Sequence, residues 1–208
     1  MPFVSFVVKK SLPDRHGAAL DAGLGRSDVN GVRHQLAYAI SPAGPGDAGD
    51  LARVHVQAWR ETYPGLLPKA YLDGLSIPRH ARLWRRRLMS THEVTLAAEG
   101  VDGLVGYCSG GESRVPGEGL AEITTLYVLR EAQDAGLGRR LLTDTARVLA
   151  ARGAVSLIIW VLRDNTPARG FYEHLGGKLD AARVETVGGR IIPSVGYRWE
   201  RLGGWVGT

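Results

Sequence analysis

The order of apolar and polar positions predicts that helices and strands alternate along most of this chain. Residues 51–62 and 78–89 repeat apolar side chains three and four positions apart, the period of an amphipathic helix. Residues 121–128 and 155–162 are instead rich in β-branched and apolar types, which is typical of buried strands. The same criteria predict further strands at 36–41, 93–100 and 103–112, two more between 182 and 200, and helices that end near 152 and 176. This order is typical of an α/β protein.

The turn between the strand at 121–128 and the following helix is the most informative segment. Gly136 and Gly138 stand where that helix begins. Glycines at a helix N-terminus leave no Cβ to block a ligand, so unpaired N–H groups and the helix dipole can bind an anion such as pyrophosphate. A tight strand-to-helix connection without a ligand uses the same glycines. On this feature alone, both interpretations stay open.

The segment from 155 to 177 favours the anion-binding interpretation. Its apolar run at 155–162 does not alternate, as in a strand that is buried on both faces. Asn165 and Thr166 then offer N-cap side chains, Pro167 suits a first helical turn, and Gly176 suits a helix end. The resulting order is strand, glycine turn, helix, strand and short helix.

These motifs resemble those of the GCN5-related N-acetyltransferase (GNAT) superfamily. Its signature Q/R-x-x-G-x-G/A is met by residues 133–138, and its later N-x-x-A/S-x-x-x-Y is met by Asn165, Ala168 and Tyr172. The resemblance covers about residues 37–200, and residues 55–75 also look like a common bacterial branch of these enzymes. It implies a mixed, twisted β-sheet of about six to seven strands with helices on both faces. It also implies that acetyl-CoA binds where two central parallel strands, here 120–129 and 155–162, splay apart.

The resemblance also implies which residues hold acetyl-CoA. The backbone just after the splay would bind the thioester carbonyl, the glycine turn would bind the pyrophosphate, and Asn165 would contact the pantetheine arm. The residues after the splay are Leu126, Tyr127 and Val128, and those of the turn are Gln133, Asp134, Ala135, Gly136, Leu137, Gly138 and Arg139. Many members carry basic or glycine residues where Asp134 and Ala135 stand, so a lower cofactor affinity than usual is expected.

Direct transfer in this family needs one group to take a proton from the amine and another to protonate the leaving thiolate. Glu122 stands eleven residues before the turn motif, where some members carry a glutamate that withdraws the proton through water. Tyr172 matches the tyrosine that protonates the thiolate. Each residue also has a structural alternative. In that case Glu122 would be a solvent-facing strand carboxylate, Tyr172 a packed helix aromatic and Asn165 a helix cap. His55 and His174 are further candidate bases, but isolated helix histidines are more often structural.

Strand alternation predicts which side chains near the splay share a face. The face of Glu122 is expected to hold Thr124, Leu126 and Val128, and the opposite face Ile123, Thr125 and Tyr127. The segment 63–75 is expected to be a loop that shapes the acceptor pocket. Two carboxylates beside it, Glu61 and Asp73, can attract a cation, although surface carboxylates usually do nothing.

The charge balance changes this picture little. The 208 residues include 26 Lys and Arg against 21 Asp and Glu, a net charge of +5 that suits coenzyme A, nucleic acid or a membrane surface equally. The basic run 79–88 fits a solvated helix face better than a nucleic-acid patch, and no helix-turn-helix, zinc or RNA-binding signature accompanies it. No apolar run approaches the ~20 residues that cross a bilayer. We expect no membrane or nucleic-acid partner and no metal, and leave a homodimer open.

The single cysteine, Cys108, cannot form an internal disulfide and fits a buried position in a reducing compartment. A cytoplasmic protein is therefore expected, and the resemblance of residues 55–75 implies a bacterial one. Residues 1–36 lack sustained periodicity and are interpreted as a leader that is loosely ordered or adds a strand, followed by the transferase domain at 37–200 and a tail at 201–208.

The expected function is transfer of an acetyl group from acetyl-CoA to a primary amine of unknown identity. A sensor that binds acetyl-CoA without catalysis is the main alternative, because its cofactor motif would look the same. The presence of Tyr172 and Glu122 favours an enzyme. A dinucleotide-dependent oxidoreductase is disfavoured because the third glycine of GxGxxG is absent.

Overall fold

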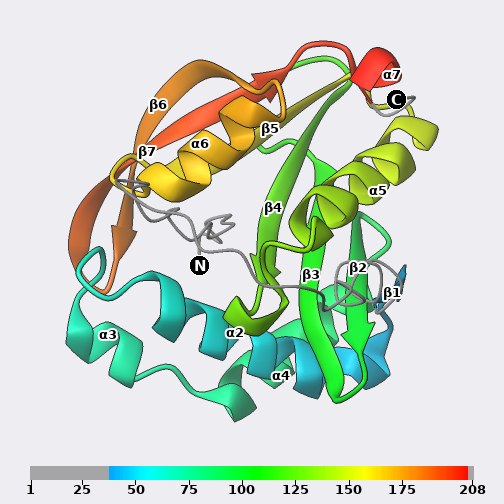
Figure 1. The fold of residues 1–208 in the computed structure, drawn as a ribbon. Coiled ribbons are helices and arrows are strands. Elements are labelled where there is room, and N and C mark those ends of the chain that lie inside the picture. The colour runs from blue at the N-terminus through cyan, green and yellow to red at the C-terminus, as the bar shows by residue number, and fades with distance from the viewer. Residues whose placement is uncertain (1–37, 206–208) are drawn as a thin grey trace, which may run out of the picture.

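The computed structural model describes residues 38–205, and Figure 1 shows the elements that they form. The predicted leader, 1–36, and the end of the predicted tail, 206–208, lie outside the described residues. The beginning of the tail forms a short helix, α7 (Leu202–Trp205). Within residues 38–205, no helix is both long and apolar enough to cross a membrane.

A seven-stranded sheet occupies the centre of the described part of the chain. Its strands are β1 (Ala39–Pro42), β2 (Glu93–Gly100), β3 (Gly103–Glu112), β4 (Leu120–Val128), β5 (Ser156–Leu162), β6 (Lys178–Val187) and β7 (Arg190–Trp199). The spatial order is β1-β2-β3-β4-β5-β7-β6, and all neighbours are antiparallel except β4 and β5. This arrangement confirms the predicted mixed sheet with a central parallel pair.

Helices cover both faces of this sheet, as predicted. The helical elements are η1 (Pro45–Asp47), α2 (Ala48–Thr62), α3 (Lys69–Asp73), α4 (Ile77–Leu88), η2 (Arg130–Ala132), α5 (Leu137–Ala151) and α6 (Thr166–His174). On one face, α2 packs against β3 and β4, and α4 against β2, while α5 packs against β2, β3 and β4 on the other. Figure 1 shows α6 beside α5 in front of the sheet, where Trp199 Nε1 of β7 donates to the backbone oxygen of Leu175 at 2.8 Å.

Two β-hairpins join strands that the sequence predicted, β2 with β3 and β6 with β7. Their turns depend on glycine, since Gly103 has φ +110° before β3 and Gly188 and Gly189 have φ +58° and +78° between β6 and β7. Two successive positive φ values are the signature of the type I′ turn that matches strand twist. The strand β6 begins at Lys178, four residues before the predicted start at Ala182.

The segment 63–75 differs from the predicted loop. The expected loop 63–75 contains a short helix, α3, which begins directly after Pro68 and in which Asp73 binds Lys69 Nζ at 2.6 Å. Both side chains of this ion pair are exposed, so it contributes little to stability. At the N-terminus of α2, the side chain of the N-cap residue Asp47 makes no cap hydrogen bond to that helix but accepts from the Gly44 N–H at 2.7 Å in the 3₁₀ turn before it.

A β-bulge interrupts β4 at Thr124. Ser109 of β3 pairs with Thr125, whereas the next residue, Gly110, pairs with Ile123, so Thr124 has no partner of its own. An extra residue in one strand bends that strand and increases its twist. The bulge therefore explains why β4 turns away from β5 directly after Ile123.

The bulge also reverses the predicted faces of the second half of β4. Ile123 and Val128 both border α5, where they lie close to its leucine side chains. Tyr127 faces the opposite helix, α2, and therefore shares the face of Glu122. The expectation that Glu122 shares its face with Leu126 and Val128 is wrong, because one extra residue shifts the two-residue alternation.

Cys108 lies in β3 and is fully buried, which confirms the interpretation of a small core residue. Burial raises the pKa of its thiol to about 12. The reactive thiolate is therefore suppressed, and the residue does not act as a nucleophile.

His55 is a buried part of α2, only 2% exposed. Its Nδ1 lies 2.8 Å from the hydroxyl of Tyr107, and its ring stacks on His80 with a centroid distance of 4.8 Å. Burial, and after it the charges of His80 and Arg87, lower the pKa of His55 well below 6.5. The folded protein therefore holds this imidazole in its neutral form.

We expect the free energy of unfolding to fall as the pH drops below about 6.5, because unfolded His55 then binds a proton that the folded state excludes. This one group contributes a loss of up to about 1.4 kcal/mol per pH unit until the lowered pKa of the folded state is reached. Chemical denaturation at about pH 7.5 and about pH 5.5 measures the slope. The variant His55→Phe removes the titrating group and should flatten it; an equal slope in both proteins would contradict the assignment.

Candidate functional site

The parallel strands β4 and β5 pair over only four residues each. Pairing runs from Leu120 to Ile123 on β4 and from Ser156 to Ile159 on β5, although the strands continue to Val128 and Leu162. Beyond Ile123, alternate backbone groups of β4 bind β3, while the others are directed toward β5 without pairing with it. This splay is where the sequence predicted backbone contacts to a thioester.

The turn after β4 has the backbone of an anion cradle. Gly136 is the N-cap of α5 with φ +72°, and a Cβ added there would meet no protein atom within 4 Å, so it would project into open space over the turn. The first N–H groups of α5 have no partner within the helix and are directed to the same side. Gln133 Nε2 donates to the Val128 oxygen at 2.9 Å and so fixes the turn to the end of β4.

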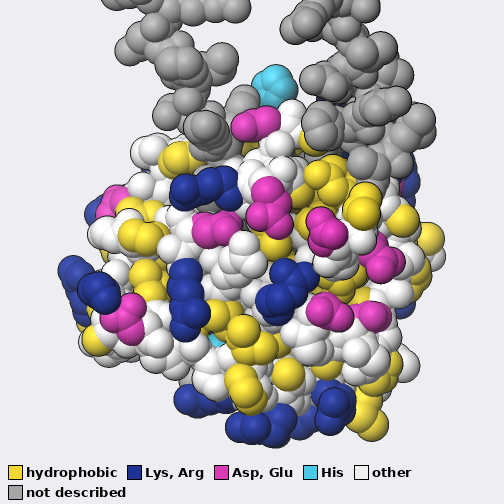
Figure 2. Space-filling model, turned by 60° about the horizontal axis from the view of Figure 1, so that its bottom comes forward, with side chains coloured by type: hydrophobic (Ala, Val, Ile, Leu, Met, Phe, Trp, Pro, Cys, Tyr) yellow, Lys and Arg dark blue, Asp and Glu magenta, His cyan; other side chains and the backbone are white. Residues whose placement is uncertain are grey.

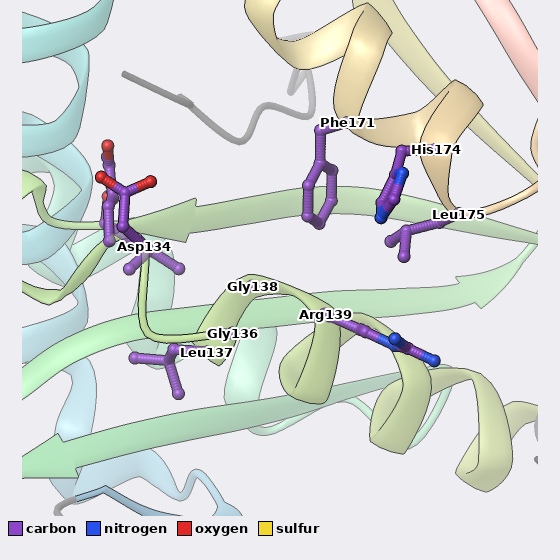
Figure 3. A pocket seen from close by; sticks show the side chains of 10 residues that line it. Asp134, Gly136, Leu137, Gly138, Arg139, Phe171, His174 and Leu175 are labelled. Atoms are coloured by element: carbon purple, nitrogen blue, oxygen red, sulfur yellow. The ribbon is translucent and has the colours of Figure 1, made fainter. Parts of the chain in front are cut away.

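A pocket of about 240 Å³ lies between this turn and α6 (Figure 3). It brings together seven of the predicted cofactor residues, namely Val128, Gln133, Asp134, Gly136, Leu137, Gly138 and Arg139. The predicted residues that do not line it are Leu126, Tyr127, Ala135, Asn165 and Tyr172. The pocket thus covers the end of β4 and most of the turn, while Leu126 and Tyr127 lie earlier on β4, Ala135 lies in the turn, and Asn165 and Tyr172 belong to α6 and its N-cap.

The residues of the opposite wall of the pocket were not predicted from the sequence to line it. Phe171, His174 and Leu175 extend from α6 and its C-cap toward the turn, facing Gly138 and Arg139 (Figure 3). Their spacing of three and four residues places them on one side of the helix, and this spacing could have identified them. His174 therefore lies beside the candidate anion site rather than near the β4–β5 splay.

Asn165 caps α6. Its Oδ1 accepts a hydrogen bond from the Ala168 N–H at 3.2 Å, so the capping alternative is confirmed. Its Nδ2 is buried and has no hydrogen-bond partner among the described residues. One end of the amide therefore supports the helix while the other end is available to a ligand.

Tyr172 lies in α6 and is fully buried among aromatic rings. Its ring is 5.9 Å from that of Tyr197 and 6.3 Å from that of Trp199. Burial raises the pKa of Tyr63 and Tyr127, and interaction with Tyr172 raises both further. The Tyr172 hydroxyl is therefore near enough to Tyr63 and to Tyr127 of β4 to affect their pKa values.

Tyr127 turns its side chain away from the splay. Its hydroxyl accepts from Trp59 Nε1 of α2 at 2.7 Å. Only the backbone of Tyr127 is thus placed to contact a cofactor, as the sequence interpretation required.

Glu122 is only 1% exposed, so the alternative of a solvent-facing carboxylate is wrong. Arg114 binds both of its oxygens, through Nε at 3.2 Å from Oε2 and through Nη2 to Oε1. The Arg114 N–H is also 3.4 Å from Oε2. The Arg114 side chain itself is half exposed, which links Glu122 to the surface.

Glu61 connects α2 to the candidate site. Its Oε2 accepts from the Arg130 N–H at 3.0 Å, directly after β4, and its Oε1 accepts from Gln57 at 3.0 Å. The expectation of an uncommitted surface carboxylate is therefore wrong for Glu61. This side chain positions the segment that leads into the anion cradle.

Figure 2 views the molecule from the end that carries α3 and α4 in Figure 1, and it shows basic side chains gathered along one rim. The exposed arginines of α4 are Arg79, Arg82, Arg85 and Arg86. Arg87 differs from them, since it is half-buried and binds Glu93 through Nε at 2.9 Å. Most of the basic run is thus an exposed helix face, and its last arginine connects α4 to Glu93 of β2 and Thr124 of β4.

Comparison with known proteins agrees with this geometry. The acetyltransferase (GNAT) family matches residues 56–177. The uncharacterized N-acetyltransferase YuaI of Bacillus subtilis is 32% identical over 157 residues, which cover 75% of this chain and 89% of that protein. The probable N-acetyltransferase Rv2775 of Mycobacterium tuberculosis is 30% identical over 172 residues, covering 78% of this chain and 93% of that protein.

The fold has a counterpart among solved structures. The PaiA N-acetyltransferase of Thermoplasma acidophilum, crystallised in complex with coenzyme A, superposes with a TM-score of 0.60 at 21% identity and covers 76% of this chain and 98% of its own. The family match extends over more than half of the sequence, and the two curated relatives are at least 30% identical over most of their length. This chain therefore belongs to the GNAT family of acetyltransferases.

Proposed function

We propose that this enzyme transfers the acetyl group of acetyl-CoA to a primary amine by direct attack of the amine on the thioester. The observation that carries the proposal is the combination of three features: the anion cradle at Gly136, the backbone groups of β4 beyond Ile123 that face β5 without pairing with it, and the buried Tyr172 of α6. The coenzyme A complex of PaiA supports the cosubstrate, since the two folds are alike.

The residues of the pocket suit an elongated, anionic cosubstrate. The cradle offers N–H groups from Gly136 to Arg139 to a pyrophosphate, and the positive side chain of Arg139 adds charge. The unpartnered Nδ2 of Asn165 and the apolar Phe171 suit an arm that carries amide groups along apolar stretches. Asp134 brings a negative charge to the same turn and opposes this binding.

The proposed chemistry balances two proton transfers. Bound acetyl-CoA supplies the thioester, and as the C–N bond forms and the C–S bond breaks, the amine loses one proton and the sulfur gains one. Unpaired N–H groups of β4 beyond Ile123 are placed to stabilise the charge that develops on the carbonyl oxygen. Tyr172 is assigned to donate its hydroxyl proton to the sulfur, and Glu122 to accept the proton of the amine through water.

The test of the proposed function is release of coenzyme A thiol with a panel of acceptors. The panel contains amino acids, polyamines, an aminoglycoside and a peptide with a free N-terminus. We expect one class to release thiol well above the rate without acceptor. An acetyl-CoA sensor would bind the cosubstrate in calorimetry and release no thiol with any member of the panel, and that result would overturn the proposal.

The role of Glu122 predicts a specific pH dependence. The variant Glu122→Gln should lower kcat/KM mainly at low pH, where the amine arrives charged and must lose a proton. The deficit should shrink toward the pKa of the free amine, near 10.4 for a lysine-like acceptor. Rate profiles of parent and variant against pH measure this difference.

The exposed Glu112, at the end of β3, provides a matched control as Glu112→Gln, which should follow the parent profile. A deficit in Glu122→Gln that is equal at all pH values would instead indicate that Glu122 positions Arg114. The absence of a deficit would assign the ion pair to stability alone.

A further inference from the structure

The proposed chemistry leaves several buried polar groups on β5, β6 and β7 unexplained. In the sheet register, Arg183 lies opposite Ser194, and Ser194 lies opposite Leu162. Glu185 and Trp160 are each two residues from these positions along their own strands, so their side chains share the same face. This is the face of Glu122, since Glu122 pairs with Ile158, two residues before Trp160.

Glu185 is buried and only half satisfied. Its side chain is 3% exposed, and its Oε1 accepts from Arg183 Nε at 2.9 Å and from Arg183 Nη2 at 2.7 Å. Arg183 is itself held over the ring of Trp160 at 4.0 Å. The second oxygen, Oε2, is buried without a hydrogen-bond partner among the described residues. Leaving a buried carboxylate oxygen unpaired is costly unless a ligand binds it.

Two neighbouring side chains carry hydrogen-bond donors that are also without a partner among the described residues. Ser194 Oγ and Trp160 Nε1 are buried and have no partner among the described residues. The benzene edge of Trp160 lies over Gly196, at 3.3 Å and 3.4 Å from the position of an added Cβ, so the Nε1 edge faces away from β7. We call Trp160, Glu185 and Ser194 the Glu185 patch. It combines two hydrogen donors with one anionic acceptor on three adjacent strands.

The Glu185 patch adjoins the splay. Burial is the main cause that raises the pKa of Tyr127 on β4, and the charge of Glu185 adds to it. Hydrogen bonds to Glu122 are the first cause that raises the pKa of Arg114, and the charges of Glu185 and Glu93 add to these. In the sheet register, Trp160 of the patch follows Ile159, the last residue of β5 that pairs with β4, so the patch begins where the two strands separate, on the face opposite to α5 and α6.

The charges around the patch are balanced. Glu93, Glu122 and Glu185 are paired with Arg87, Arg114 and Arg183 respectively. These three ion pairs have no net charge, so they attract a ligand with several positive charges only weakly. A ligand with one amine and one oxygen acceptor would satisfy the unpaired atoms without upsetting the balance.

We propose that the Glu185 patch binds the acetyl acceptor, a small primary amine that also carries an oxygen acceptor, as an amino acid does. The amino group donates to Glu185 Oε2, Ser194 donates to one oxygen of the carboxyl group, and Trp160 Nε1 donates to the other oxygen from the side away from β7. This inference rests on the proposed function, because it assigns the amine side of the same reaction. It assigns Glu185 to substrate binding, whereas Glu122 keeps the assignment of proton acceptor.

The first test compares the parent with Glu185→Gln, which keeps an oxygen for Arg183 and replaces the free oxygen by an amide nitrogen. The probes are L-alanine, L-valine and L-phenylalanine, each beside the amine that lacks its carboxyl group. With the best probe, we expect the KM for the acceptor to rise about 10- to 10²-fold, the range of one hydrogen bond to a charged group. The KM for acetyl-CoA and the melting temperature should stay unchanged.

Glu99→Gln changes an exposed glutamate on β2 and serves as the matched control. Trp160→Phe keeps a ring under Arg183 and removes the Nε1 donor, so it should erase the preference for each amino acid over its decarboxylated amine. An acceptor KM within about twofold of the parent in Glu185→Gln would overturn the proposal, since this lies far below the hydrogen-bond range. Equal turnover of amino acids and their decarboxylated amines by the parent would overturn it too.

Calorimetric titration of the same probes into the protein–coenzyme A complex measures binding without turnover. Binding that Glu185→Gln weakens about tenfold supports the patch even if the parent releases no thiol, in which case only the proposed function fails. Thiol release with equal probe affinity in both proteins overturns the patch and leaves the proposed function in place. Should Glu185→Gln fail to fold, Ser194→Ala removes one donor of the patch and is judged by the same two measurements.

Discussion

Tyr172→Phe is expected to lower kcat by about 10² to 10⁴ at neutral pH, the range that a positioned proton donor contributes. The substitution keeps the ring, which packs between Phe171, Tyr197 and Trp199, and removes only the hydroxyl. The affinity for coenzyme A and the melting temperature should therefore change little. Steady-state thiol release, calorimetry and thermal denaturation measure the three quantities.

Tyr197→Phe is the matched control, because Tyr197 is another buried tyrosine of the same aromatic cluster. Its hydroxyl binds Glu173 and Arg169 on the outer side of α6 and has no place in the proposed chemistry. This variant should keep the parent kcat. A Tyr172→Phe enzyme within about twofold of the parent, well below the general-acid range, would transfer the protonation step to water or another group.

The core of the site could be predicted from the sequence because its signals are local. Glycines at the start of an amphipathic helix, a buried strand before it and a capped short helix after the next strand each depend on neighbouring residues. The structure places Gly136 at the N-cap of α5 and Asn165 at the N-cap of α6 accordingly. Such local signals do not depend on contacts with distant segments. For this reason the order of helices and strands could be predicted correctly.

The details that sequence could not supply depend on contacts between distant segments. The bulge at Thr124 follows from the register between β3 and β4, and a single strand pattern gives no sign of it. The burial of Glu122 depends on Arg114, which follows β3 in an irregular segment and returns to β4. Similarly, only the register of β5, β7 and β6 places Glu185 on one face of the sheet with Ser194 and Trp160.

One side of the pocket could be predicted from the sequence, and the other could not. Its floor at Gly136 and Gly138 was predicted from a motif, while its second wall at Phe171 and His174 comes from a helix whose orientation toward α5 no local pattern reports. Residues on α6 thus have two roles that the sequence could not separate. Tyr172 is directed inward to the aromatic cluster, and its neighbours on the adjacent side of the helix line the pocket.

Gly136→Val is expected to weaken acetyl-CoA binding by at least about 10²-fold, because the cradle would lose several hydrogen bonds to a charged group. The native φ of +72° disfavours a β-branched residue, and the added side chain would project into the open space over the turn. Gly136 is exposed, so far-ultraviolet circular dichroism should remain native. Calorimetric titration with acetyl-CoA measures the loss.

Two further variants separate the cradle from general effects of substitution. Gly49→Val changes a glycine in the first turn of α2 that also has open space around its Cβ position but no positive φ, and it should leave acetyl-CoA affinity unchanged. Asp134→Gly should act in the opposite direction, since it removes a negative charge from the turn and relieves a φ of +63° that strains a residue with a side chain. Tighter binding in Asp134→Gly together with loss in Gly136→Val would locate the pyrophosphate at this turn. Unchanged affinity in a folded Gly136→Val protein would place it elsewhere.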